Sequence, residues 1–215
     1  MNTLLADERD GVLRREPTVC AIDERSDEVL AIGTAALELA AERAVILVHP
    51  LRHGSISDFD VTEQMVRMLL GNRRGGWFSQ PRVLVAALAA TTPVERRAVS
   101  EAILAAGVRQ VLVMEESAAA AIGAGLPIDQ AAGTCIVDIG GGTTEVAVIS
   151  LGGIVAQKAA PVGSVDLDEA IIRMFAEEHG LAISERLATR VKEQAASAAP
   201  TVSYTHLTLP TNREV

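Results

Sequence analysis

Three short apolar runs separated only by glycine turns are the feature that most limits the fold of this chain. The runs lie at 134–139, 144–150 and 153–160, and β-branched residues are frequent in them. Connections this short allow only antiparallel pairing between consecutive strands. The sequence therefore predicts a three-stranded antiparallel meander whose first connection contains three consecutive glycines.

Upstream of the meander, strand-like runs alternate with helical patterns. Strands are expected at 18–22, 44–48, 82–88 and 110–114, and helices at 60–70, 91–107 and 116–125. Asp60 would cap the first helix, and Thr92, Pro93 and Glu95 would begin the second. Two further helices, 165–179 and 184–195, follow the meander. This order indicates an α/β fold with mixed sheets flanked by helices.

Composition excludes several classes of function. The 215 residues are 49% hydrophobic and carry a formal net charge of −9, which does not favour nucleic acid as a partner. No run approaches the roughly 18 uninterrupted apolar residues of a transmembrane helix, and the N-terminal sequence lacks the pattern of a secretory signal. Pro50 separates His49 from His53, so we assign no metal site or chemistry to the histidines. Both cysteines, Cys20 and Cys135, are expected to be buried thiols.

The glycine connection has the composition of a phosphate-binding turn. Glycine removes the side chains that would keep a phosphate away from backbone N–H donors. Thr143 and Thr144 would add hydroxyl donors, and Asp138 would hold a hydrated Mg²⁺. The segment is neither a Walker loop nor a dinucleotide fingerprint, because no lysine and no helix follow the glycines. An ordinary tight hairpin that uses glycine for turn geometry is the alternative.

The segment VDIGGGTTEVAVISLGGIV, residues 137–155, resembles the second phosphate hairpin of actin-like ATPases. It is especially similar to the MreB/Mbl family of bacterial cell-shape proteins. Other segments follow in the order of that family: EPTVCAID (16–23), HPLRHGSISDFDVTEQM (49–65), VERRAV (94–99), EESAAAAIGAGLP (115–127) and DEAI (168–171). The resemblance covers about residues 2–200.

This resemblance implies an actin-like ATPase fold of the ribonuclease H-like type, with nucleotide bound between two lobes. Residues 1–133 would form most of lobe I, and 134–200 the first half of lobe II. The chain is expected to be truncated at both ends, so that only Asn2 and Thr3 remain of the first phosphate loop. Residues 201–215 do not fit the pattern and look like a non-native or disordered tail.

The resemblance also implies roles for individual residues. Glu116 would orient the attacking water with Thr143 as its partner, and Asp138 would hold Mg²⁺ through water. Without the resemblance, Glu115 and Glu116 would be read as acidic residues that stabilise a helix N-terminus. The remaining nucleotide contacts would come from Gly140, Gly141, Gly142, Thr143, Thr144 and Glu145 at the hairpin, and from Lys192 and Gln194 near the nucleoside.

Two departures from the family pattern weaken the implied activity. Residues 86–92, AALAATT, replace a Gly-Val-Pro-Ser-Gly type of turn, and Gln194 stands near the place of an expected glutamate. Most of the first phosphate loop and the family's segments beyond Pro200 are also expected to be missing. We therefore expect weak ATP binding and little turnover from this chain by itself, and slow filament-linked ATPase activity from a complete protein.

The segment GNRRGGWFSQP, residues 71–81, is expected to be an exposed loop. Trp77 and Phe78 suit the boundary between lipid headgroups and acyl chains, and the neighbouring arginines suit anionic lipid. Family members carry a membrane-dipping apolar loop at about this place. The alternative is that both rings fold back into a small satellite core.

Together these features predict an ATP-binding, membrane-associated actin-like filament that organises cell-wall synthesis and sets cell shape. It would assemble with copies of itself on the inner face of the cell membrane and meet cell-wall elongation proteins there. Two alternatives stay open: a soluble chaperone or kinase of the actin superfamily, and a non-catalytic or inert fragment.

Overall fold

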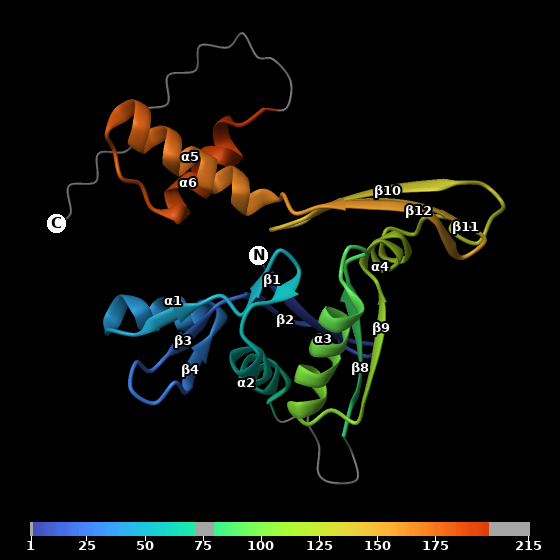
Figure 1. Cartoon of the computed structure of the whole chain (residues 1–215), viewed down its shortest axis with the longest axis horizontal. Helices are drawn as coiled ribbons and strands as arrows, with labels where there is room; N and C mark the ends of the chain where they lie inside the picture. The colour runs from blue at the N-terminus through green and yellow to red at the C-terminus, as the bar shows by residue number, and fades with distance from the viewer. Residues whose placement is uncertain (1, 72–79, 198–215) are drawn as a thin grey trace. The chain divides into compact units, whose positions relative to one another are not determined.

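The computed structural model describes residues 2–71 and 80–197, and Figure 1 labels its helices and strands. The chain separates into two compact units, Met1–Asp166 and Leu167–Val215. Trp77 and Phe78, for which the sequence predicts membrane contact, and residues 201–215 lie outside the described residues. The assignment of 1–133 and 134–200 to two lobes stays a prediction.

The first unit begins with a hairpin that the sequence patterns did not predict. Strand β1 (Asn2–Asp7) pairs antiparallel with β2 (Gly11–Pro17), and Asp7 Oδ1 accepts hydrogen bonds from two backbone N–H groups of the turn. A second sheet has the order β4-β3-β5, formed by Val29–Ile32, Cys20–Ile22 and Ile46–Val48. The predictions for β3 and β5 are confirmed, whereas β4 was not foreseen.

One helix connects β4 to β5 of this sheet, and a small hairpin and a second helix follow β5. Helix α1 (Gly33–Glu42) was not predicted, and α2 (Phe59–Leu70) agrees with its predicted span within one residue. The predicted cap Asp60 is wrong. The side chain of Asp58 accepts from the Val61 N–H at 3.0 Å, because it occupies the extended position just before the first turn. Between α1 and α2, β6 (Leu51–Arg52) pairs with β7 (Ser55–Ile56).

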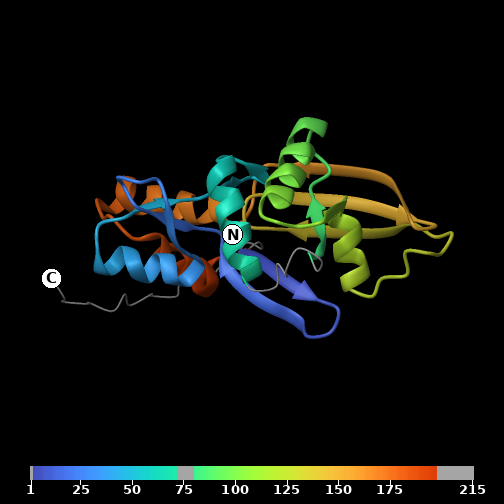
Figure 2. The ribbon, with the colours of Figure 1, turned by 90° about the horizontal axis from the view of Figure 1, so that it is seen from below.

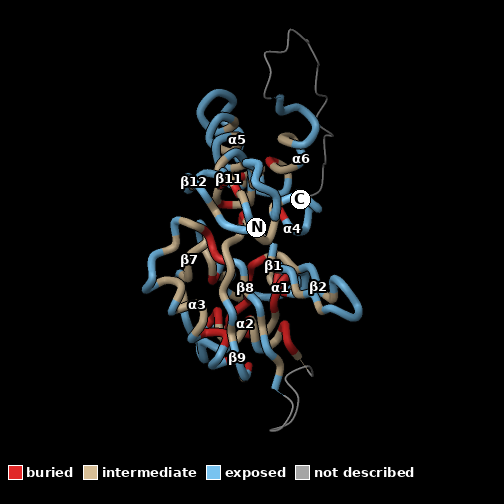
Figure 3. Tube along the Cα trace, turned by 90° about the vertical axis from the view of Figure 1, so that its right-hand side faces the viewer, coloured by how far each residue is buried: buried red, intermediate tan, exposed pale blue. Residues whose placement is uncertain are grey.

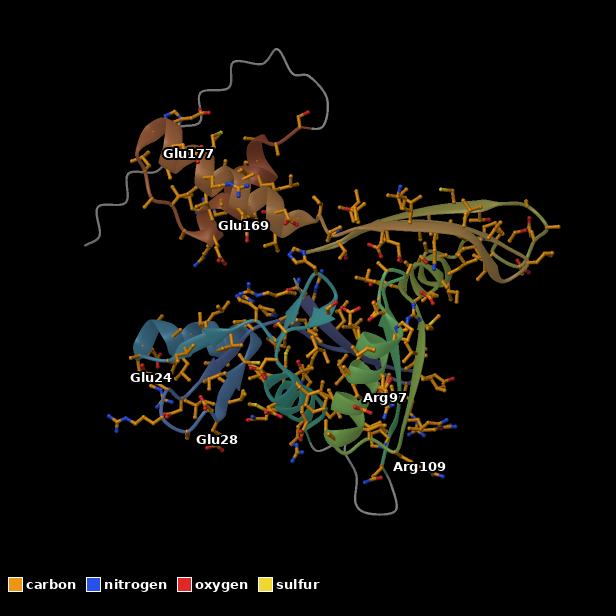
Figure 4. The ribbon with its side chains drawn as sticks, in the orientation of Figure 1. Glu24, Glu28, Arg97, Arg109, Glu169 and Glu177 are labelled. Carbon is orange, nitrogen blue, oxygen red and sulfur yellow. The ribbon has the colours of Figure 1, made fainter. Side chains whose placement is uncertain are left out.

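A parallel strand–helix–strand unit comes next. Strand β8 (Arg82–Ala87) pairs in parallel with β9 (Gln110–Glu115), and α3 (Pro93–Ala105) connects them. The predicted capping box is confirmed: Glu95 N–H donates to Thr92 Oγ1 at 3.2 Å, and Thr92 N–H donates to Glu95 Oε2 at 2.8 Å. Arg97 projects from α3 and pairs with Glu101 (Figure 4).

The predicted meander is confirmed. After α4 (Glu116–Gly123), strands β10 (Thr134–Ile139), β11 (Thr144–Ser150) and β12 (Gly153–Ala160) form one antiparallel sheet in sequence order, visible side by side in Figure 2. The register places Ile139 opposite Thr144, so residues 140–143 form the connection between β10 and β11.

The core of the first unit lies around the β4-β3-β5 sheet, α2 and α3. Figure 3 shows buried stretches, in red, around the labels of α2 and α3. Cys20 is buried there, and burial raises the pKa of its thiol to about 12. The expectation for Cys135 is wrong, because it lies on the exposed side of β10. Aliphatic and sulfur-containing side chains fill this core: Cys20, Ile22, Val29, Ile32, Val61, Met65 and Leu69 in one cluster, and Leu70, Ile103, Ala106 and Val108 in another.

The second unit contains most of α5 (Ser164–His179) and all of α6 (Glu185–Ala195). Ser184 caps α6 by accepting from the Leu187 N–H at 3.3 Å. The Lys192 ammonium lies 2.9 Å from Asp168 Oδ2, and this pair joins the two helices. None of the helices within 2–71 and 80–197 is long and apolar enough to cross a membrane.

Candidate functional site

The glycine connection between β10 and β11 is a closed turn whose carbonyls are all engaged. Gly140 N–H donates to Thr143 O at 2.8 Å and closes the turn. The carbonyls of Gly140 and Gly141 accept from the first two N–H groups of α5, at 3.0 and 2.8 Å. The carbonyl of Gly142 accepts from His53 Nδ1 at 2.9 Å. Since a carbonyl can only accept, the ring proton of His53 is on Nδ1.

The orientation of these carbonyls fixes the direction of the neighbouring N–H groups. In a trans peptide the C=O and the following N–H point in opposite directions, and the described chain has no cis peptide. The N–H groups of Gly141, Gly142 and Thr143 therefore point away from α5 and His53. In the described part of the chain, none of these three N–H groups has an acceptor. Adjacent backbone donors of this kind form a site for an anion.

Two glycines make this packing possible. A Cβ on Gly163 would lie 2.6 Å from both the C and O atoms of Gly141, which is closer than real contacts allow. A Cβ on Gly142 would lie 3.3 Å from the N and Cα atoms of His53. His53 itself has a φ of 47°, in the left-handed region. The turn is thus held by close backbone contact with β6–β7 on one side and the start of α5 on the other.

Three carboxylates lie beside the turn. Asp138 is near the end of β10, Glu145 is opposite it on β11, and Glu116 is the first residue of α4. Burial raises the pKa of Glu116, and the negative charges of Asp138 and Glu145 raise it further. Repulsion among carboxylates next to free N–H donors favours a ligand that brings both a cation and an anion.

The donor set fits a magnesium ion that arrives with phosphate. Among the described residues, no group of three or more His, Cys, Asp or Glu could hold a metal ion. Mg²⁺ commonly binds through one carboxylate, several waters and substrate phosphates, and does not need such a group. Asp138 is half-buried and is the carboxylate at the end of the strand that leads into the turn.

The loop after β8 is fixed next to these carboxylates. Arg96 donates to Leu88 O at 3.1 Å and forms an ion pair with Glu115, 2.8 Å from Oε1. Glu145 accepts from the N–H of Ala89 at 2.7 Å and from the N–H of Ser117 at 3.2 Å. Residues 88–92 of the altered segment 86–92 therefore connect β8 to α3 with backbone groups of Leu88 and Ala89 held by hydrogen bonds.

Comparison with known proteins identifies the family. The family model described as MreB/Mbl protein matches residues 1–210. The chain belongs to the MreB/Mbl family. The cell shape-determining protein MreB of Haemophilus influenzae is 42% identical over 207 residues, which are 92% of this chain and 58% of that protein. This MreB/Mbl chain thus spans about 60% of the length of that relative.

Solved structures agree with this assignment. MreB 5 of Spiroplasma citri bound to AMPPNP matches with a TM-score of 0.83 and 29% identity, over 94% of this chain and 62% of that one. The MamK double helical filament matches with a TM-score of 0.74 and 20% identity, over 90% of this chain and 61% of that one. The predicted actin-like fold is confirmed, and the matches cover about three fifths of each structure.

The MreB/Mbl chain brings several predicted site residues together and separates others. Glu116 lies close enough to Asp138 for the two charges to interact, and Asp138 lies two residues before the 140–143 turn, in which Thr143 is half-buried. Thr144 belongs to β11, and its hydroxyl donates to Val162 O at 2.8 Å. Glu145 is 2% exposed, with its carboxylate bonded to backbone N–H groups.

The remaining predicted residues lie on other elements. Asn2 and Thr3 begin β1, where Thr3 Oγ1 is 2.9 Å from Thr18 Oγ1. Lys192 and Gln194 lie on α6 in the second unit, and Lys192 pairs with Asp168. Their roles toward a nucleotide stay predictions.

Sequence reasoning missed His53, Gly163 and the first N–H groups of α5. The only sequence signal for His53 is the following Gly54, which marks a turn but does not identify its contact 89 residues away. Gly163 precedes a helix, a common arrangement that by itself indicates no ligand.

Proposed function

We propose that this chain carries the phosphate-binding part of an ATP-dependent actin-like filament protein that determines cell shape. The observation that carries the proposal is the 140–143 turn, whose three N–H groups point away from α5 and His53. The turn follows Asp138, whose charge interacts with that of Glu116. The support from relatives is a cell-shape MreB at 42% identity and an AMPPNP-bound MreB 5 at 29% identity.

Residues in and near the turn would have separate roles in binding and hydrolysing a nucleoside triphosphate. The N–H groups of Gly141, Gly142 and Thr143 would bind the terminal phosphates. Asp138 would hold Mg²⁺ through water, and the ion would neutralise charge that develops on the phosphate oxygens. Glu116 would accept a proton from the attacking water, and its raised pKa suits a base better than that of an exposed glutamate. Thr143 would help to orient the water.

Assembly and membrane contact are the larger part of the proposed function. MamK, whose fold this chain shares, is solved as a double helical filament, and we propose that copies of the complete protein also form filaments. Trp77 and Phe78 would insert into the inner face of the cell membrane, where the filament would meet cell-wall elongation proteins. A single loop binds lipid weakly, so alignment of many loops along a filament would supply the avidity.

Titration with a fluorescent ATP analogue and Mg²⁺ tests nucleotide binding. Gly142→Ala should weaken binding about tenfold, because its Cβ would lie 3.3 Å from the backbone of His53 and displace the turn. Gly123→Ala is the matched control, since a Cβ there meets nothing within 4 Å. Equal affinity of both variants and the parent chain, or no binding by any of them, would contradict the proposed site.

Sedimentation tests assembly and membrane contact. With the chain extended to the full length of its relatives, ATP should increase the pelleted fraction, whereas a soluble kinase or chaperone would stay in the supernatant. Replacement of both Trp77 and Phe78 by Ser should abolish pelleting with anionic vesicles and leave ATP-dependent pelleting intact. Unchanged pelleting with lipid would reject the membrane role of these residues.

A further inference from the structure

Glu145 is a charged side chain that the proposed chemistry does not use directly. It is 2% exposed, and the β10–β11 register places it opposite Asp138. Residues directly opposite in an antiparallel pair project from the same face, and like charges there are destabilising. A buried carboxylate in this position needs compensating partners.

Those partners are two backbone N–H groups from different elements. Glu145 Oε1 accepts from Ala89 at 2.7 Å, in the loop after β8, and Oε2 accepts from Ser117 at 3.2 Å, in the first turn of α4. One side chain on β11 thus holds the loop and the helix start together. The positive end of α4 adds a favourable interaction with this carboxylate.

The Ser117 N–H belongs to the peptide group that follows Glu116. A hydrogen bond to this N–H fixes the plane of that peptide, and with it the backbone from which the Glu116 side chain extends. The charge of Glu145 also acts on Glu116, together with that of Asp138. Arg96 balances part of this charge, because Glu115 and Glu145 both stabilise its protonated form.

We propose that Glu145 is a positioning residue, which ties the Glu116–Ser117 peptide and the Ala89 loop to β11 and does not touch the nucleotide. This inference replaces the nucleotide contact that the family resemblance implied for Glu145. Its catalytic consequence rests on the proposed function, since Glu116 must act on water beside a bound nucleotide. Its structural part does not depend on that function.

The structural part is tested without nucleotide, by amide exchange and carboxyl titration in NMR. In Glu145→Gln either the Ser117 or the Ala89 amide should exchange about tenfold faster, because the Gln side chain keeps only one oxygen to accept from these two N–H groups. The titration midpoint of Glu116 should move to lower pH, because one neighbouring negative charge is removed. Glu101→Gln, which removes a carboxylate from the exposed pair with Arg97 on α3, should change neither readout.

A second variant removes the donor and leaves the carboxylate. Ser117→Pro lacks the N–H, and proline is tolerated in the first turn of a helix. Ser117→Ala keeps the N–H and loses only a buried hydroxyl that has no hydrogen-bond partner in the described structure. In both Glu145→Gln and Ser117→Pro, single-turnover hydrolysis should slow about tenfold while the Kd for the ATP analogue changes less than about twofold. Ser117→Ala should slow it less than Ser117→Pro.

The outcomes distinguish three roles for Glu145: positioning of Glu116, direct contact with the nucleotide, and stabilisation of the fold alone. In Glu145→Gln the acidic limb of the pH–rate profile should shift to lower pH, a change that a merely structural residue would not produce. Equal losses in affinity and turnover would show direct nucleotide contact and overturn the proposal. Unchanged exchange at both the Ser117 and Ala89 amides, together with an unchanged Glu116 titration, would overturn it as well. If the parent chain binds no nucleotide, the proposed function fails while exchange and titration still decide the role of Glu145.

Discussion

His53 Nδ1 lies 2.9 Å from the carbonyl oxygen of Gly142, and this hydrogen bond joins residues 89 positions apart. It connects the β6–β7 turn to the glycine connection between β10 and β11. The bond fixes the peptide between Gly142 and Thr143, so that the Thr143 N–H points away from His53. The histidine thereby helps to direct one of the three free donors of the site.

His53→Ala should weaken binding of an ATP analogue about fivefold, because a typical net hydrogen bond contributes about 1 kcal/mol. His53→Asn should restore most of the affinity. The Asn side-chain amide places a donor at the position of Nδ1, and Asn tolerates the positive φ of 47° found here. Isothermal titration of the three proteins measures the effect. Equal losses in both variants would show that the ring itself, and not the donor, matters.

Gly163→Ala should disturb the same turn from its other side. The new Cβ would lie 2.6 Å from the C and O atoms of Gly141 and 2.7 Å from the carbonyl oxygen of Gly140. Overpacking of this kind typically costs about 1–3 kcal/mol of unfolding free energy. Urea denaturation should show the loss, and nucleotide affinity should fall with it. Gly123→Ala, at an uncrowded helical position, should not be destabilised.

Local patterns predicted much of the fold. The three strands at 134–139, 144–150 and 153–160 agree with their predicted bounds, because glycine turns limit both their length and their pairing. The capping box of Thr92 and Glu95 was also correct, since its geometry depends on residues three positions apart. The β1–β2 hairpin escaped prediction because its strands contain several charged residues and none of their residues is fully buried.

The candidate site was only partly predictable, for a physical reason. The glycine run and Asp138 are adjacent in sequence, so their chemistry is visible in one short segment. The contacts that orient the turn come from His53 and from the first N–H groups of α5, which are distant in sequence or lie in the backbone. Residue types carry little information about such contacts, and the burial of Glu145 is likewise a consequence of packing.

Glu116→Gln should separate stability from activity. Burial and the charges of Asp138 and Glu145 raise the pKa of Glu116 in the folded protein. The protonated form of Glu116 therefore stabilises the folded protein. This stabilisation is fully present below the unfolded pKa of about 4.5 and is lost as pH rises through the folded pKa. At pH 7 the Gln variant should be more stable than the parent, and the difference should shrink toward pH 4.

Activity should change in the opposite direction. Loss of the proposed base should slow hydrolysis about 100-fold, within the range usual for general bases, while nucleotide affinity is kept. Urea denaturation across this pH range and single-turnover hydrolysis measure the two effects. A Gln variant that is less stable at pH 7, or that hydrolyses at the parent rate, would contradict this assignment of Glu116.

The hydrogen bonds of Glu95 make the free energy of unfolding depend on pH in the direction opposite to that of Glu116. Hydrogen bonds from Ser55 and from the hydroxyl and N–H of Thr92 lower the pKa of Glu95 from 4.5 to about 2. The stabilisation is present above the unfolded pKa of about 4.5 and is lost as pH falls toward 2. The parent should therefore lose stability across this window more steeply than Glu95→Gln. Ser55→Ala removes the largest cause of the lowered pKa. Its free energy of unfolding, measured by urea denaturation at each pH, should lie between those of the parent and Glu95→Gln. Parallel curves for all three proteins would mean that Glu95 does not hold these hydrogen bonds in solution.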